Sequence, residues 1–144
     1  MRNFILPLLI FFLPLNLYAK NESTCDFLNS DMLQMANKME KALRRCPLIK
    51  SLPNIVISLR NQTNQFVDQT KFAELIHSNI EKKSHAKAEE KEPDLEIQAT
   101  LSESRRAIHL ICKSTYTLSA VVSQSGEELC RKSVKIIKRG RASP

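Results

Sequence analysis

Glycine and aromatic residues are scarce in this chain of 144 residues. It has two glycines, Gly126 and Gly140, with six phenylalanines, two tyrosines and no tryptophan. It has no phosphate-binding loop, and no serine lies in a nucleophile elbow. The basic residues are not interleaved with aromatic side chains on which bases would stack. The sequence therefore disfavours nucleic acid as a partner.

Patterns that carry catalysis or bind metal are also missing. The three histidines, His77, His85 and His109, form no recognised metal-binding motif or cysteine–histidine catalytic motif with the cysteines and carboxylates. Asp94 and Glu96 form a close pair of carboxylates, but charged side chains at alternate positions of a strand are usually only solvated. We therefore expect no enzyme activity, no cofactor and no metal site.

One long apolar run occurs, from Phe4 to Leu17, and the polar Lys20 follows it closely. This is the layout of a secretory signal, with cleavage expected after Ala19. The run is shorter than the roughly 20 residues that a helix needs to span a bilayer, and no later stretch approaches that length. Residues 1–19 are therefore predicted to be a signal peptide, and the mature chain is predicted to have no integral membrane segment.

The remaining residues, 20–144, are enough for one domain and too few for two. Cleavage removes Arg2 from the 22 basic residues, leaving 21 against 15 acidic ones, a net charge of +6. Such a surface suits an anionic polymer of the cell envelope or an acidic protein patch. The alternative is that these side chains simply keep the surface solvated.

Two helices are predicted by apolar side chains at steps of three and four residues. The first runs from Phe27 to Arg45, with Ser30 or Asp31 as its cap, and Pro47 ends it. The second spans about 69–83.

Asp68 is the expected cap of the second helix. A short apolar strand at 55–59 precedes it and breaks at a polar loop. The residues after this helix, 84–93, form a charged connector with nothing to bury, which we expect to be mobile.

Alternating apolar and polar residues predict three further strands, at 95–101, 107–122 and 128–138. The last two flank Gly126 and form a long hairpin in which Val122 faces Glu128. Since each strand has one apolar face, we expect helices on one side of the sheet only. The predicted fold is a small α/β (α+β) domain with a mixed, mainly antiparallel sheet.

The helix, the strand–loop–helix of Pro53–Ser84 and the hairpin of Thr115–Arg139 follow one another in an order that resembles the B-type penicillin-binding protein activators. The members of this family are periplasmic lipoproteins that switch on a bifunctional peptidoglycan synthase. Where the family has a further strand and helix, this sequence has only the connector at 84–93. No lipidation box precedes Cys25, so we expect an exported, unlipidated periplasmic protein.

The resemblance implies a non-enzymatic protein that binds and stimulates a class A penicillin-binding protein. The alternative is a structural or assembly component of a cell-envelope, secretion or flagellar structure. Asn61 and Thr63 match the family's loop after the first strand, and with Arg60 and Gln65 they form the expected partner-binding surface. Asn and Thr in such loops also bond to their own backbone and hold a turn.

Four cysteines in an exported chain suggest two disulfides. Cys25 and Cys46 would lie roughly 30 Å apart along one helix, and Cys112 and Cys130 roughly 26 Å apart in the hairpin. A disulfide needs α-carbons within about 7 Å. Any bridge must therefore join different elements, such as Cys46 and a strand cysteine, and the pairing stays open. Cys112 and Cys130 are most simply small core residues.

Overall fold

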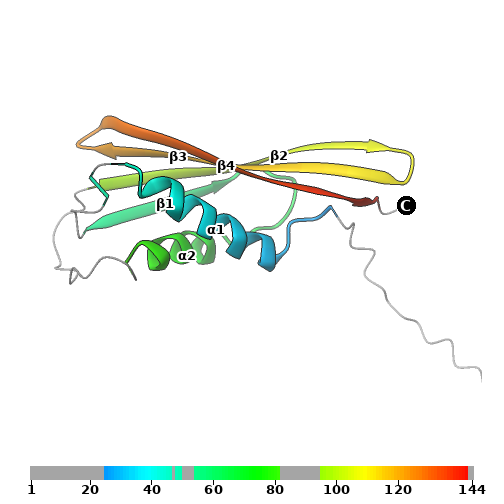
Figure 1. Cartoon of the computed structure of the whole chain (residues 1–144), viewed down its shortest axis with the longest axis horizontal. Coiled ribbons are helices and arrows are strands. Elements are labelled where there is room, and N and C mark those ends of the chain that lie inside the picture. Colours follow the sequence, from blue (N-terminus) through cyan, green and yellow to red (C-terminus); the bar gives the residue numbers. More distant parts are fainter. Residues whose placement is uncertain (1–24, 47, 50–53, 82–94, 143–144) are drawn as a thin grey trace, which may run out of the picture.

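The computed structural model describes residues 25–46, 48, 49, 54–81 and 95–142, which form two helices and four strands (Figure 1). In chain order these are α1 (Asn29–Leu43), β1 (Ile55–Asn61), α2 (Gln69–Glu81), β2 (Leu95–Ile108), β3 (Ile111–Gln124) and β4 (Glu127–Arg141). The predicted signal peptide and the charged connector lie outside the described residues.

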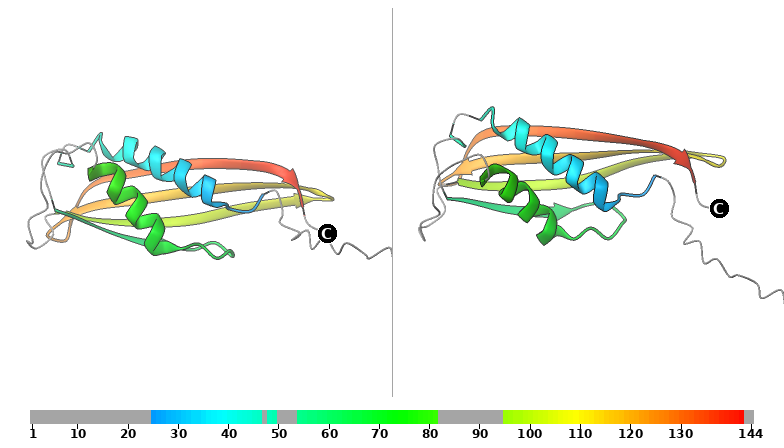
Figure 2. Two further views of the ribbon diagram at one scale, coloured as in Figure 1. Left: turned by 90° about the horizontal axis from the view of Figure 1, so that it is seen from below. Right: turned by 60° about the horizontal axis from the view of Figure 1, so that its bottom comes forward.

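The four strands form one mixed sheet in the order β1-β2-β3-β4. β1 runs parallel to β2, and the pairs β2–β3 and β3–β4 are antiparallel. Both helices lie on the same side of the sheet, as the two views in Figure 2 show. The structure thus confirms the predicted α+β fold, with its mainly antiparallel sheet, helices on one face and long C-terminal hairpin.

The core lies between the helices and one face of the sheet. The apolar stripes of α1 and α2 supply buried residues at helical spacing: Met32, Met35, Ala36, Met39 and Leu43 from the first, Phe72, Ile76 and Ile80 from the second. Every even-numbered residue of β3 from Cys112 to Val122 is buried, and those from Tyr116 onward belong to the same apolar core. The odd-numbered residues of β3 and their partners in register lie on the side without helices, which we call the open face.

The ends of α1 differ from the prediction. The helix begins at Asn29 with Leu28 in the cap position, rather than Ser30 or Asp31. Asp31 still satisfies the helix start, because its carboxylate accepts the Leu28 N–H at 2.8 Å. The helix ends at Leu43, two residues before the predicted end at Arg45. Pro47, which was expected to stop the helix, lies outside the described residues.

Asp68 caps α2 as predicted. Its Oδ1 accepts the backbone N–H of Lys71 at 3.0 Å, which satisfies a donor at the helix start. The described helix ends at Glu81.

The predicted strand at 107–122 is wrong at its beginning. A two-residue turn at His109 and Leu110 divides it, so β2 ends at Ile108 and β3 begins at Ile111. Ile108 and Leu110 are 71% and 65% exposed and do not belong to the core. The apolar alternation runs unbroken through the turn, and no glycine, proline or asparagine marks it. Instead His109 adopts a positive φ of 56°.

The second hairpin has the predicted turn but a different register. Gly126 takes a φ of 81°, which a tight hairpin turn requires and which glycine adopts without a steric penalty. The prediction pairs Val122 with Glu128, whereas the structure pairs Val122 with Cys130. A β-bulge beside Val122 leaves Leu129 without a partner in register and accounts for one residue of this two-residue shift. The other residue comes from the turn, which is short enough that Gln124 pairs with Glu127.

All four cysteines are bonded, so the interpretation of Cys112 and Cys130 as free core residues is wrong. Cys25 is joined to Cys112, and Cys46 to Cys130, with Cα–Cα distances of 6.3 Å and 6.1 Å. Both bridges join different elements, as the distance argument requires. They tie the segments before and after α1 to the sheet.

Candidate functional site

The loop between β1 and α2 is held by its own side chains. The Oδ1 of Asn61 accepts the backbone N–H of Thr63 at 2.9 Å, and its Nδ2 donates to the Gln65 carbonyl at 2.8 Å. The hydroxyl of Thr63 lies 2.7 Å from the Asn61 Oδ1 and 3.2 Å from the Gln65 carbonyl. Asn61 and Thr63 therefore fix the loop conformation, as asparagine and threonine commonly do in turns.

Gln65 fastens the same loop to the sheet. Its Nε2 donates to the hydroxyl of Tyr116 at 2.6 Å and lies 3.2 Å from a carboxylate oxygen of Glu103. Its Oε1 accepts the backbone N–H of Phe27 at 2.7 Å. One amide side chain thus joins the loop, two strands and the segment that leads into α1.

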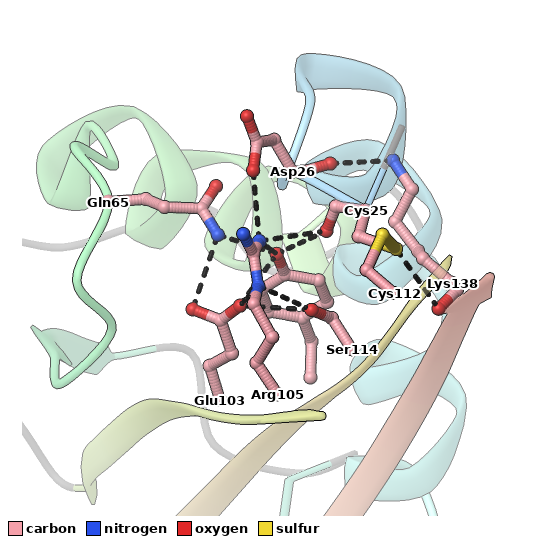
Figure 3. Close-up of a disulfide and its surroundings, with 9 residues drawn as sticks. Cys25, Asp26, Gln65, Glu103, Arg105, Cys112, Ser114 and Lys138 are labelled. Atoms are coloured by element: carbon pink, nitrogen blue, oxygen red, sulfur yellow. Dashed lines mark hydrogen bonds and ion pairs between the residues drawn. A yellow bond between two sulfur atoms is a disulfide. The ribbon is translucent and has the colours of Figure 1, made fainter. Parts of the chain in front are cut away.

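Figure 3 shows the polar cluster that Gln65 enters, beside the disulfide of Cys25. The Tyr116 hydroxyl donates to the Cys25 carbonyl at 2.6 Å. The guanidinium of Arg105 donates to Glu103 at 2.8 Å and to Asp26 at 2.9 Å. Ser114 completes the cluster through a 2.8 Å contact with the Arg105 Nε.

Opposing effects set the protonation of this cluster. Burial alone would lower the pKa of Arg105, but hydrogen bonds to Asp26 and Tyr116 raise it. The charge of Glu103 raises it too, so the net pKa lies above the ordinary value. Burial raises the pKa of Tyr116, although its hydrogen bonds with Gln65 and Arg105 act in the opposite direction. Near neutral pH the cluster therefore contains a charged arginine and a neutral tyrosine.

Lys138 ties the last strand to the start of α1 next to this cluster (Figure 3). Its ammonium group donates to the Asp26 carbonyl at 2.7 Å, as Figure 3 shows. It also donates to the Asp31 carboxylate at 2.6 Å. Among the described residues, every buried side-chain nitrogen and oxygen has a hydrogen-bond partner. The cluster is thus internally satisfied and acts as a support for the loop above it.

The loop presents two features to solvent. The first is a hollow of about 340 Å³ with a polar lining: Gln62, Thr63, Asn64, Gln65, Glu103 and Arg105. The second is Phe66, whose side chain is 93% exposed. A phenylalanine this exposed, on a loop this well fixed, is an available anchor for another protein, because aromatic side chains dominate the energy of many interfaces.

The four residues predicted to bind a partner divide into two groups. Asn61, Thr63 and Gln65 lie together and their side chains hold the loop. Arg60 is exposed near the end of β1 and pairs in register with Thr100 on the open face. The sequence interpretation gave no role to Phe66, the large exposed apolar side chain of this loop. The available signal was an aromatic residue directly after a run of polar ones.

The structure gives no positive sign of a catalytic or metal centre in the part of the chain that it describes. There, histidine, cysteine, aspartate and glutamate side chains nowhere gather in threes with a geometry that would hold a metal ion. No described helix has the length and apolar character needed to cross a membrane. Two disulfides are consistent with a protein of the cell envelope, because disulfides persist in oxidising compartments.

No family model and no curated protein matches the chain. Among solved structures, it is similar to the LpoB C-terminal domain from Salmonella enterica, with a TM-score of 0.42 and 9% sequence identity. The matched region covers 73% of this chain and 94% of that domain. The case for a function rests on the chain's own residues.

Proposed function

We propose that this protein is an exported, non-enzymatic activator that binds and stimulates a class A penicillin-binding protein in the periplasm. The mature form is residues 20–144, without a lipid anchor. Support comes from the sequence resemblance to B-type activators. The helix, strand, loop, helix and long hairpin that carry this resemblance occur in the same order in the fold.

The observation that carries the proposal is the exposure of Phe66 on a loop fixed by Asn61 and Thr63. A partner that covers Phe66 gains apolar burial without having to order the loop first. Such preorganisation lowers the entropic cost of association. Arg60, exposed nearby in sequence at the end of β1, supplies a charge that orients an acidic partner surface.

This arrangement assigns different roles to the predicted contact residues. Arg60 and Phe66 contact the synthase directly. Asn61, Thr63 and Gln65 act mainly by holding the loop in shape, since their side chains are already engaged in hydrogen bonds. Substituting these three would lower stability and binding together, so they are poor probes of the interface.

The test uses Arg60→Glu and Phe66→Ala in the mature domain, mixed with a purified class A synthase. Both side chains are exposed, so the melting temperature should stay nearly unchanged. Phe66→Ala should weaken binding by about 2 kcal/mol, or roughly 30-fold, as for an aromatic anchor. The unmodified domain should accelerate glycan polymerisation or cross-linking, and both variants should do so less.

Matched controls are Arg45→Glu and Leu33→Ala, which change an exposed charge and an exposed apolar side chain on the helical side. Neither should affect binding. Equal losses in the controls and the loop variants, or no stimulation of the synthase by the unmodified domain, would contradict the proposal.

The second candidate is a structural or assembly component of a cell-envelope, secretion or flagellar structure. The observation that favours it is β4, a 15-residue strand at one edge of the sheet. A long edge strand is a template for pairing with another chain. Ordered self-assembly in sedimentation experiments, together with no effect on a synthase, would select this candidate.

A further inference from the structure

The hairpin between β2 and β3 ends in an exposed aliphatic tip. Ile108, Leu110 and Ile111 are 71%, 65% and 67% exposed. Ile108 and Ile111 are direct partners in register, and Leu110 lies in the two-residue turn that joins them. The tip projects past the ends of both helices (Figures 1 and 2), and no helix covers it. A cluster of this kind on a soluble surface marks a contact site.

The tip is held in place from behind. The disulfide to Cys25 attaches at Cys112, next to Ile111. The backbone N–H of Ala142, the residue after β4, donates to the Leu110 carbonyl at 2.7 Å. This hydrogen bond attaches the turn to the end of β4. The aliphatic side chains therefore cannot readily fold back onto the core and are presented to solvent.

A row of three cations crosses the open face just behind the tip. Lys113 pairs in register with Arg106 on one side and with Arg139 on the other. Like charges directly opposite each other destabilise a sheet. Neither adjacent row on this face contains a carboxylate: one holds Ser104, Thr115 and Ile137, and the other Ile108, Ile111 and Arg141.

A hollow of about 250 Å³ lies within this region. It is lined by Ser104, Arg106, Lys113 and Thr115. Two hydroxyl groups beside two cationic side chains form a suitable environment for the oxygen atoms of a phosphate group. The cationic row therefore complements an anionic ligand.

From the spacing of the tip and the row, we propose that this end of the protein binds the surface of an anionic lipid bilayer. The row lies two residues behind the Ile108–Ile111 pair, or roughly 7 Å along the strands. Side chains at a bilayer interface are buried about 5–10 Å into the boundary between headgroups and acyl chains. When Ile108, Leu110 and Ile111 reach that depth, the three cations lie level with the lipid phosphates.

Other occupants explain fewer of these features. A second copy of this chain would bring its own cationic row towards this one, and the two would repel. An acidic protein patch would complement the cations but leave the projecting aliphatic tip without a partner. An anionic bilayer complements both features. Its phosphates lie at the depth of the cationic row, and its acyl chains lie deeper, at the aliphatic tip. The inference does not depend on the proposed contact with a synthase.

The first experiment uses the absence of tryptophan from the chain. Leu110→Trp places a single fluorophore at the tip, and Val56→Trp places one at the far end of the same open face, at a site that is 48% exposed. Vesicles of phosphatidylcholine with phosphatidylglycerol should shift the Leu110→Trp emission to the blue, and brominated acyl chains should quench it. Val56→Trp should show neither effect, and vesicles of phosphatidylcholine alone should act weakly.

The second experiment separates local from overall charge. Replacing Arg106, Lys113 and Arg139 together by glutamine should weaken binding to the anionic vesicles on the order of 100-fold, about fivefold for each cation. The control replaces Lys41, Arg45 and Lys71, three exposed cations in or just after the helices, so the net charge falls by the same three units. It should weaken binding only a fewfold.

Three results would overturn the inference. Equal weakening by the two triple variants would show attraction by net charge alone. Tight binding of soluble polyglutamate without any blue shift of Leu110→Trp on vesicles would show a site for acidic polymers. A sedimenting dimer in which Leu110→Trp is already blue-shifted without lipid would show that the tip contacts a second copy.

Discussion

At the scale of single residues, Tyr116 holds the centre of the support beneath the candidate contact loop. Its side chain is fully buried, and its hydroxyl joins the Cys25 carbonyl to Gln65. It also packs against Phe27, with ring centroids 5.0 Å apart. Ionisation of this hydroxyl would place a charge in the protein interior and would remove the proton that it donates to Cys25.

This position predicts a loss of stability in alkali. Burial raises the pKa of Tyr116 above its ordinary value of about 10. Its contribution to folding is therefore fully present below pH 10 and is lost as the pH rises through the folded-state pKa. In residues 20–144 Tyr116 is the sole tyrosine, so its ultraviolet absorbance reports the titration directly. The midpoint should lie above 10 in the folded domain and fall to about 10 after unfolding.

The Tyr116→Phe variant supplies the control. It removes the titrating hydroxyl, so its stability should depend less on pH above 10, although it should be less stable by about 1–3 kcal/mol at neutral pH. A folded-state midpoint at or below 10 would contradict the burial of the hydroxyl.

At the candidate site, the sequence predicts local contacts but not contacts between distant residues. The turn-forming tendency of Asn61 and Thr63 is a local property, and the structure shows both side chains bonding within the loop. The attachment of Gln65 to Tyr116 joins residues 51 positions apart. It follows from the packing of the loop on β3, which no local pattern encodes. Whether Arg60 binds a partner stays a prediction.

At the scale of elements, helices were easier to predict than the ends of strands. Apolar residues at helical spacing gave both helices to within a few residues. The hairpin of β2 and β3 was not predicted, because its turn preserves the alternation of apolar residues. At this turn a histidine with positive φ stands in place of glycine or asparagine. The register of the second hairpin depends on a bulge, which shifts pairing without altering composition.

The two faces of β3 predict opposite effects for neighbouring substitutions. Leu118 is fully buried on the helix-covered face, whereas Thr117 lies on the open face. Leu118→Asp should destabilise the domain by about 3 kcal/mol or more, because it removes core packing and buries an unpaired charge. Thr117→Asp should cost much less. Thermal melts of the two variants check this, and equal losses would mean that the core face is assigned wrongly.

At the scale of the whole molecule, the two disulfides replace much of the stability that a larger core would supply. They join residues 87 and 84 positions apart and attach both flanks of α1 to the sheet. Cross-links over such long loops typically contribute about 2–5 kcal/mol each. They hold the helical layer on the sheet independently of side-chain packing.

Removing one bridge at a time should therefore be costly. Cys46→Ala with Cys130→Ala should lower the free energy of unfolding by about 2–5 kcal/mol, and so should Cys25→Ala with Cys112→Ala. Only the second pair should also loosen the polar cluster and the hairpin tip, which hydrogen exchange at residues 103–116 would report. Urea unfolding of both variants provides the energies. A change below about 1 kcal/mol in both would show that the bridges are dispensable.

The interleaved pairing also governs how the chain is oxidised. Cys25 and Cys46 are separated by 21 residues and Cys112 and Cys130 by 18, whereas the native pairs are separated by 87 and 84. Since the probability of closing a flexible loop falls as about the three-halves power of its length, the wrong pairs form roughly tenfold more readily in an unfolded chain. An unfolded chain that meets an oxidant is trapped with neighbouring cysteines joined, and it reaches the native state by thiol–disulfide exchange. Its yield in a cell then depends on a disulfide isomerase as well as on an oxidase.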